Sequence, residues 1–574
     1  MSSSRTAHLP ATRDFQPLPD NASLEERIAL SYRRARAIAK AYAMTAEDTL
    51  YLRPKFWEFH TDNIHSMDAG AFTLLTIQYN LMGGTLAAFA QKRPELRSIM
   101  DKVMRFDVSA QFLLTEVGHG LDAPNLETTA TLLPNGEFDL HTPSERARKY
   151  MPPTGPFGSL PRVAIVFARL IVQGENRGVR PFLVALGDGE QMCKGVTARL
   201  VPQRGGIKPV DHAVTSFNHV RLPSTALLGS LAKPADLRAN FISCIWRVAV
   251  GSLALATMAI PLLSVNAYLA ARYSIRRLVT GSDGAPVSIM TFRTQHGPIL
   301  HALAQVEVMK AHGKAAIDMF RDPSIDSRVR DGIAAAAKAS MTRHTWSSLG
   351  NLTERIGAHG VFEHNNVLQS ELLMRGIRIA EGDVLVLSIR LANELLIGRY
   401  SMPTPKYPDC PISRHEAGLF AECRDILARA GGNHRHDSVS RLMLPRCLPL
   451  VQAIGHRMAY EAAVDGGVAK PLLDLYEAGV MLEDPAWYAE HVGLARWVQF
   501  EMEDRAITAA LPHLDEYLAQ TGAEPYVVSP ILTQERWENF LNDLPLFTGN
   551  AQLALIPPVP RAPQQAPVQI QAHL

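Results

Sequence analysis

The chain has 574 residues, of which 47% are hydrophobic and 20% charged, the balance of a soluble globular protein with several domains. Its formal net charge of +2 provides neither a basic surface for nucleic acid nor an acidic tail. The five cysteines stand apart from one another, which fits a reducing compartment and argues against a disulfide scaffold. The 20 histidines follow no metal-binding spacing such as HExxH, so the sequence predicts no metal site.

Helical patterns begin early in the chain. Residues 1–22 lack the apolar run of a secretory signal, and we expect a loose leader there. Ser23 and Glu26 then have the spacing of a capping box, which predicts the start of a helix. Helical periodicity continues to about residue 112, so we predict an N-terminal α domain over residues 1–112.

The pattern changes to β-type runs near residue 115. Two such runs flank Pro134-Asn135-Gly136, which predicts a hairpin. Further short apolar runs, broken by Gly, Pro and Asp, continue to about Pro223. We therefore predict a middle β domain over residues 113–235.

The rest of the chain is again helical. Long Ala- and Leu-rich stretches predict a helical bundle over residues 236–400. A break with four prolines over 401–411 separates it from a second α domain, predicted over 401–550. Residues 551–574 are rich in Pro and Gln and are predicted to form a disordered tail.

One stretch raises the question of a membrane span. Residues 248–271 carry no charge and are long enough to cross a bilayer. Their many Gly, Ala and Ser residues, the interruption at Pro261 and the lack of a second such stretch favour a helix buried in the bundle. We therefore predict no membrane span.

Specific strings carry more information than periodicity. They are LLTEVGHGLDAPNLETTATLLPNGEFDL (113–140), ARYSIRRLV (271–279), FRTQH (292–296), GAHGVFE (357–363), IAEGDVLVL (379–387) and LYEAGVMLEDPAWYAEH (475–491). In this order they resemble the acyl-CoA oxidase branch of the acyl-CoA dehydrogenase superfamily, over about residues 25–550. The resemblance implies a multidomain α+β fold: an N-terminal α-helical domain, a middle β-barrel domain, a C-terminal α-helical bundle and an additional α-helical domain.

The resemblance implies that Glu381 is the catalytic base. Family chemistry is the α,β-dehydrogenation of an acyl-CoA, in which a carboxylate removes the α-proton. A Glu in an apolar pocket has a raised pKa and is a stronger base, and Gly382 lets the backbone pass close to the substrate. By position alone Glu381 is an ordinary acid at a helix N-terminus, a role that also suits Asp383.

The resemblance also implies FAD as the cofactor, held across a subunit interface and therefore in at least a homodimer. Thr115 matches the family threonine that meets the flavin ring. Arg277 matches the arginine that meets the pyrophosphate, although Arg276 beside it is an alternative, and Gln295 supports the same end of FAD. Glu116, which travels with Thr115, and the nearby His119 are assigned no chemistry because either suits a turn.

The sequence departs from the family pattern at several points. Pro153 takes the place of the glycine that meets the flavin, and it cannot donate a backbone N–H, so Gly155 is the substitute candidate. Leu121, Arg293 and Ala358 also replace usual family residues. We therefore expect an active site of unusual shape.

Three functions are compatible with this sequence. The first is an acyl-CoA oxidase of fatty-acid β-oxidation, which makes trans-2-enoyl-CoA and passes electrons to O₂ to give hydrogen peroxide. The second is an acyl-CoA dehydrogenase-like desaturase of a biosynthetic, polyketide-type thioester. The third is a non-catalytic, flavin-poor partner subunit. The ending Ala572-His573-Leu574 is a relaxed form of the peroxisomal Ser-Lys-Leu address, so we expect a peroxisomal protein, or otherwise a cytoplasmic one.

Overall fold

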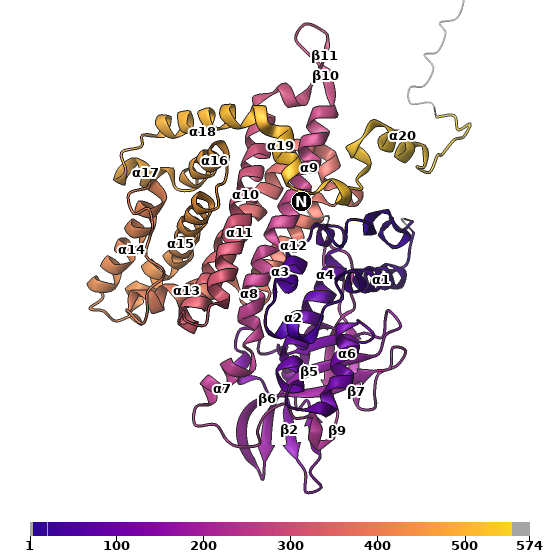
Figure 1. Cartoon of the computed structure of the whole chain (residues 1–574). Coiled ribbons are helices and arrows are strands. Elements are labelled where there is room, and N and C mark those ends of the chain that lie inside the picture. The colour runs from indigo at the N-terminus through magenta and orange to yellow at the C-terminus, as the bar shows by residue number, and fades with distance from the viewer. Residues whose placement is uncertain (1–3, 20, 554–574) are drawn as a thin grey trace, which may run out of the picture.

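The N-terminal part is helical and packs against the bundle that forms the middle of the molecule (Figure 1). The structure, a computed structural model, describes residues 4–19 and 21–553, so the Ala-His-Leu ending and most of the predicted tail lie outside it. The predicted capping box is confirmed, because the Ser23 hydroxyl accepts from the Glu26 N–H and the Ser23 N–H donates to the Glu26 carboxylate. The N-terminal elements are α1 (Leu24–Tyr42), α2 (Ala46–Leu50), α3 (Pro54–His60), α4 (Ala69–Thr76), the π-helix η4 (Ile77–Gly83), α5 (Gly84–Ala90) and α6 (Arg97–Met104).

The expectation of a loose leader is wrong for the described residues before α1. Two short 3₁₀ helices, η1 (Leu9–Ala11) and η2 (Arg13–Phe15), lie there, and Leu9 and Phe15 are buried. The apolar side chains in an otherwise polar leader explain the difference, since they belong to the same core as the N-terminal helices.

A six-stranded sheet and a three-stranded sheet form the β region. The predicted hairpin is confirmed, because β2 and β3 pair antiparallel around the turn. The six-stranded sheet has the order β1-β5-β2-β3-β9, with β6 on the other edge of β5, and the second sheet has the order β4-β8-β7. The strands are β1 (Ser109–Leu113), β2 (Thr129–Leu132), β3 (Phe138–His141), β4 (Lys149–Pro153), β5 (Arg162–Val172), β6 (Glu175–Gly187), β7 (Val196–Leu200), β8 (His212–Phe217) and β9 (Val220–Leu222).

The bundle contains the helices that position the site. The apolar stretch lies within α8 and α9, which together span Arg247–Arg276. Among the described residues this is the one helix long and apolar enough to cross a membrane, and 89% of its most apolar window is buried, as predicted for a core helix. The elements of this part are α7 (Leu237–Cys244), α8 (Arg247–Thr257), α9 (Ala259–Arg276), β10 (Leu278–Thr280), β11 (Pro286–Ser288), α10 (Arg293–Arg321), α11 (Ser327–Ile356), α12 (Val367–Ile379) and α13 (Val384–Leu396).

The last helices follow the proline-rich break. In Figure 1 α14 to α18 pack on the side of the bundle away from α1, and α15 contacts both α10 and α11. These helices are α14 (Pro411–Arg429), α15 (Leu444–Asp465), α16 (Lys470–Met481), α17 (Pro485–His491), α18 (Arg496–Ala510), α19 (Leu514–Gln520) and α20 (Gln534–Asn542).

Candidate active site

Glu381 lies in the tight connection between α12 and α13, ahead of the helix rather than in its first turn. Its φ is +50° and that of Gly382 is +100°, both in the left-handed region. A Cβ on Gly382 would come within 2.9 Å of the Leu387 Cδ1, so this position needs glycine for space as well as for φ. Asp383 is the N-cap of α13 and accepts from two backbone N–H groups. The ordinary N-terminal acid is therefore Asp383.

Two side chains hold this connection from the bundle. The Lys338 ammonium on α11 donates to the carbonyls of Ala380, at 2.5 Å, and of Gly382, at 2.6 Å. The Ser252 hydroxyl on α8 donates to the Glu381 carbonyl at 2.5 Å. These bonds stabilise a left-handed backbone at Glu381 that a non-glycine residue adopts only at a cost of about 1–3 kcal/mol.

The Glu381 carboxylate points into the bundle against α8. Asn80 in the π-helix η4 donates its Nδ2 to the Glu381 Oε2 at 2.8 Å and to the Arg247 carbonyl at 3.2 Å. Gly251 lies directly beneath the carboxylate, because a Cβ there would overlap the Glu381 Oε2. Gly251, which has no side chain, and the Asn80 amide, which donates a hydrogen bond, thus fix the position of the Glu381 carboxylate.

Burial raises the pKa of Glu381 to about 7, although Lys338, the Asn80 hydrogen bond and Arg247 act to lower it. Burial also lowers the pKa of Lys338, against the opposing effect of Glu381. A carboxylate with a pKa near neutrality suits a general base, since it is basic enough to take a proton and still ionised in part at neutral pH.

Arg247 is a second buried charge beside the site. Its guanidinium donates to the carbonyls of Asn80, at 2.8 Å, and Thr49, at 3.1 Å, and stacks on Trp246 with 4.7 Å between the guanidinium carbon and the ring centroid. Burial lowers its pKa to about 9. Gly84 makes room for it, because a Cβ there would overlap the guanidinium.

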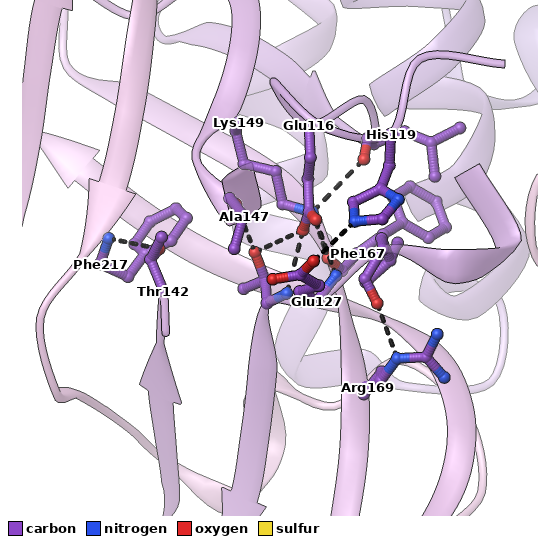
Figure 2. Close-up of polar contacts among 12 residues, drawn as sticks. Glu116, His119, Glu127, Thr142, Ala147, Lys149, Phe167, Arg169 and Phe217 are labelled. Atoms are coloured by element: carbon purple, nitrogen blue, oxygen red, sulfur yellow. Dashed lines mark hydrogen bonds and ion pairs between the residues drawn. The ribbon is translucent and has the colours of Figure 1, made fainter. Parts of the chain in front are cut away.

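Thr115 and Glu116 follow β1 and have different surroundings. Figure 2 shows the contacts of Glu116. Glu116 is buried and its carboxylate contacts the Lys149 ammonium at 2.9 Å, while it accepts from the Glu127 and Thr128 N–H groups. His119 contacts Glu127 at 2.9 Å. These contacts hold the turn after β1 against β4 and β2. Thr115 is part-exposed; its carbonyl accepts from the Tyr150 N–H, and within the described ranges its hydroxyl makes no hydrogen bond.

The other predicted cofactor residues lie in two separate places. Arg277 is the C-cap of α9, is exposed and has no hydrogen bond from its side chain among the residues described, whereas the Arg276 side chain donates to the Ile531 carbonyl and Gln534. Gln295 lies in the first turn of α10 with its Oε1 buried and unpaired. Gly155, by contrast, lies in the β region and already donates its N–H to the Asp211 carbonyl at 3.4 Å.

The residues around Glu381 that the sequence analysis missed come from distant parts of the chain. Asn80 lies 301 residues from Glu381, and Lys338 lies in the alanine-rich α11. The sequence contains one signal for Lys338, which is the single charged residue in the apolar string IAAAAKASM (333–341). A buried ammonium needs several hydrogen-bond acceptors, so such a lysine indicates a polar site. Gly251 gives no such signal, since its stretch contains other small residues.

The comparisons with known proteins agree on one family. No family model matches the chain. It is 24% identical over 421 residues to acyl-coenzyme A oxidase acox-1.1 of Caenorhabditis elegans, covering 68% of this chain and 59% of that protein. It is 26% identical over 361 residues to the peroxisomal acyl-coenzyme A oxidase 2 of Arabidopsis thaliana, covering 58% of this chain and 51% of that protein. The matches thus span a little over half of each relative.

Solved structures extend the agreement to nearly the whole chain. The crystal structure of acyl-CoA oxidase 1 from Yarrowia lipolytica has a TM-score of 0.78 at 16% identity, covering 96% of this chain and 90% of that one. Acyl-CoA oxidase-2 of C. elegans, solved with FAD, ascaroside-CoA and ATP, has a TM-score of 0.75 at 16% identity, covering 94% and 89%. The predicted multidomain α+β fold is confirmed. The chain is thus a relative of the acyl-CoA oxidases in sequence and has their fold.

Proposed function

We propose that the chain is an FAD-dependent acyl-CoA oxidase, which converts an acyl-CoA to a trans-2-enoyl-CoA and passes the electrons to O₂. The observation that carries the proposal is the Glu381 carboxylate, buried over Gly251 and held by Asn80, with a pKa raised to about 7. A structural acid has no need of this placement, whereas a base that takes a proton from carbon does.

Glu381 takes the α-proton of the bound thioester and becomes a neutral carboxylic acid. Its desolvated position makes the carboxylate a stronger base than a solvated one, and the Lys338 clamp fixes its backbone during the transfer. FAD, when bound, supplies the acceptor for the β-hydrogen, which leaves as hydride. With FAD bound, the overall reaction would transfer two electrons and two protons from the acyl-CoA to O₂ and give hydrogen peroxide, and Glu381 would return its proton to solvent.

The residues present fit FAD in part. The Thr115 hydroxyl, the Arg277 guanidinium and the Gln295 carbonyl oxygen are polar groups without side-chain partners among the described residues, as expected of contacts kept for a ligand. Thr115 would meet the flavin ring, and Arg277 and Gln295 the pyrophosphate end. Gly155 fits less well, because its N–H is already bonded to Asp211.

The distances along α8 and α9 support a homodimer. Ser252, which contacts Glu381, and Arg277 lie at opposite ends of this helical pair, about 38 Å apart at 1.5 Å per residue. Figure 1 shows the β10–β11 hairpin, next to Arg277, at the far end of the bundle from the β region. A cofactor that reaches the base would therefore meet the Arg277 of a second copy of the chain.

A cavity beside Arg247 is our candidate for part of the acyl-CoA site. It has a volume of about 390 Å³ and lies between α5, α7 and the middle of β6, with Phe89 and Trp246 in its walls. Trp246 precedes Arg247, whose carbonyl shares the Asn80 amide with Glu381. The cavity is thus next to the residues that hold the base.

The test is anaerobic mixing of purified protein with a panel of acyl-CoAs while the flavin absorption band is followed. We expect bleaching by at least one acyl-CoA and, on admission of air, recovery with one hydrogen peroxide per turnover. Glu381→Gln should retain the yellow cofactor and lose the bleaching rate by about 10²- to 10⁴-fold.

Other outcomes separate the alternatives. A yellow protein that only a polyketide-type thioester bleaches would favour the biosynthetic desaturase. A colourless protein that does not take up FAD would support the flavin-poor partner subunit and overturn the proposed enzyme.

We also propose a peroxisomal location, because relatives are named peroxisomal and the chain ends in Ala-His-Leu. Deletion of residues 572–574 from a fluorescent fusion should move the protein from peroxisomes to the cytosol. Unchanged peroxisomal fluorescence would show that this ending is not the address.

A further inference from the structure

Three helical segments bring two histidines and a glutamate together on the side of α11 toward the last helices. His344 lies on α11, His456 on α15, and Glu483 just after α16. One ligand atom from each lies within 4.8 Å of the other two, and the His344 Nδ1 is 3.3 Å from the Glu483 Oε1. The sequence spacing does not suggest this group, because 112 and 27 residues separate its members along the chain.

One ring nitrogen of this group is left without a partner. His456 is 3% exposed, and its Nε2 has no hydrogen bond among the described residues. A buried nitrogen without a partner costs free energy, so this unpaired imidazole beside the Glu483 carboxylate indicates an absent ligand with a positive charge.

The orientation of His344 fits metal coordination. Its Nε2 lies 3.2 Å from the Tyr476 hydroxyl, which leaves the Nδ1 directed to Glu483. Histidine ligands in metal sites commonly donate the other ring N–H to a neighbouring oxygen, which fixes the tautomer. Tyr476 provides that oxygen here.

An ion can reach this group from the surface, because the Glu483 side chain is 31% exposed.

We propose that His344, His456 and Glu483 bind a divalent transition-metal ion of the zinc class, with Tyr476 orienting His344. Two imidazoles and a carboxylate form a ligand set that Zn²⁺ accepts, at bond lengths of about 2.0–2.2 Å. Binding would turn the His344 and His456 rings, which are stacked with 4.8 Å between their centroids, so that each directs one nitrogen at the ion. The bound ion would join α11 to α15 and to the end of α16, and it is distinct from the Glu381 site.

The first experiment is titration of tag-free, chelator-treated full-length protein with Co²⁺, a spectroscopic substitute for Zn²⁺. We expect one equivalent of Co²⁺ with visible d–d absorption that one equivalent of Zn²⁺ abolishes. Zn²⁺ should also raise the midpoint of thermal unfolding, whether or not acyl-CoA oxidation is found, so this test does not depend on the proposed function.

Glu483→Gln is the decisive variant because the residue is exposed and the change keeps its shape. We expect Co²⁺ affinity to fall by about 10-fold or more and the thermal shift with Zn²⁺ to disappear. Glu490→Gln, the same change on an exposed position of α17, should behave as the unaltered protein. His456→Ala should also abolish binding, but it opens buried space, so Glu483→Gln decides if that variant does not fold.

The exposed His434 and His436 are the main competing source of metal binding. A His434→Gln, His436→Gln variant should retain the stoichiometric site. The proposal is overturned if this variant loses Co²⁺, if Glu483→Gln binds as tightly as the unaltered protein, or if no stoichiometric Co²⁺ binding is seen.

Discussion

The carboxylate of Glu381 rests on a glycine, and this contact sets how precisely the proposed base is placed. A methyl group at position 251 would overlap the Glu381 Oε2, and it would come within 2.7 Å of the Asn80 Nδ2. The carboxylate must therefore move when Gly251 gains a side chain.

We expect Gly251→Ala to lower the rate of flavin reduction by about 10²-fold, because displacements of about 1 Å in an active site have effects of that size. The measurement is stopped-flow flavin reduction with an acyl-CoA from the panel that bleaches the flavin of the unaltered protein. Gly350→Ala on α11, where a Cβ meets no atom within 4 Å, is the matched control and should retain the normal rate. Equal rates in the two variants would contradict the proposed placement of the base.

The raised pKa of Glu381 also predicts a pH dependence. The base must be ionised to act, so kcat/KM should rise with pH through an apparent pKa near 7 and then level off. Lys338 lowers the pKa of Glu381, so Lys338→Met should move the rising limb to higher pH.

Lys314→Met, which removes an exposed ammonium paired with Asp318, should leave the pH profile unchanged. A profile that does not shift in Lys338→Met would show that this ammonium acts only on the backbone carbonyls that it binds.

At the scale of elements, the buried pair of Glu116 and Lys149 joins the end of β1 to β4. Both side chains are 0% exposed, and Lys149 also donates to the Phe167 carbonyl on β5 at 2.7 Å. Burial lowers the pKa of Lys149 to about 8, against the effect of Glu116. The pair thus holds the segment that carries Thr115.

We expect Lys149→Met to destabilise the protein by about 3–5 kcal/mol, because it leaves the Glu116 charge buried and unpaired. Denaturant unfolding measures this. Arg441→Met, which breaks the exposed pair with Asp437, should cost less than about 1 kcal/mol. A double Glu116→Gln, Lys149→Met variant should recover part of the loss, and no recovery would argue against a specific pair.

The sequence predicted helices and turns where the signal lies within a few neighbouring residues. It did not predict contacts between residues that are distant in the chain. The capping box at Ser23 and the β2–β3 hairpin are encoded within a few residues, and both are present. Residues 109–112 were predicted to be helical but belong to β1, because this strand forms by pairing with β5, which lies much later in the chain. Glu381 was found through neighbouring strings, whereas Asn80 and Lys338 meet it only after folding.

At the scale of the whole molecule, the first described residues contact the segment that follows α19. The Thr6 hydroxyl lies 2.9 Å from the Tyr526 hydroxyl and donates to the buried Asp62, which also accepts from Tyr42 at 2.7 Å. Phe15 is 2% exposed and lies under the Arg34 guanidinium. The first residues therefore help to hold the N-terminal helices and the segment after α19 together.

We expect Phe15→Ala to lower the free energy of unfolding by about 3–5 kcal/mol, the usual cost of removing a buried aromatic ring. Thermal and denaturant unfolding of the full chain measure the change. Arg13→Ala, two residues earlier and exposed, should change stability by less than about 0.5 kcal/mol. Similar values for both variants would mean that this segment does not contribute to the core.

The order in which the chain is synthesised matters for the apolar helical pair α8–α9. Its mean hydropathy reaches 2.1, yet its main cover includes α10 and α11, which are made later. During synthesis this segment, with the composition of a membrane span, is therefore complete before α10 and α11 are made. During those seconds the nascent chain depends on chaperones to avoid aggregation and misdirected insertion, although the finished protein keeps the same residues inside.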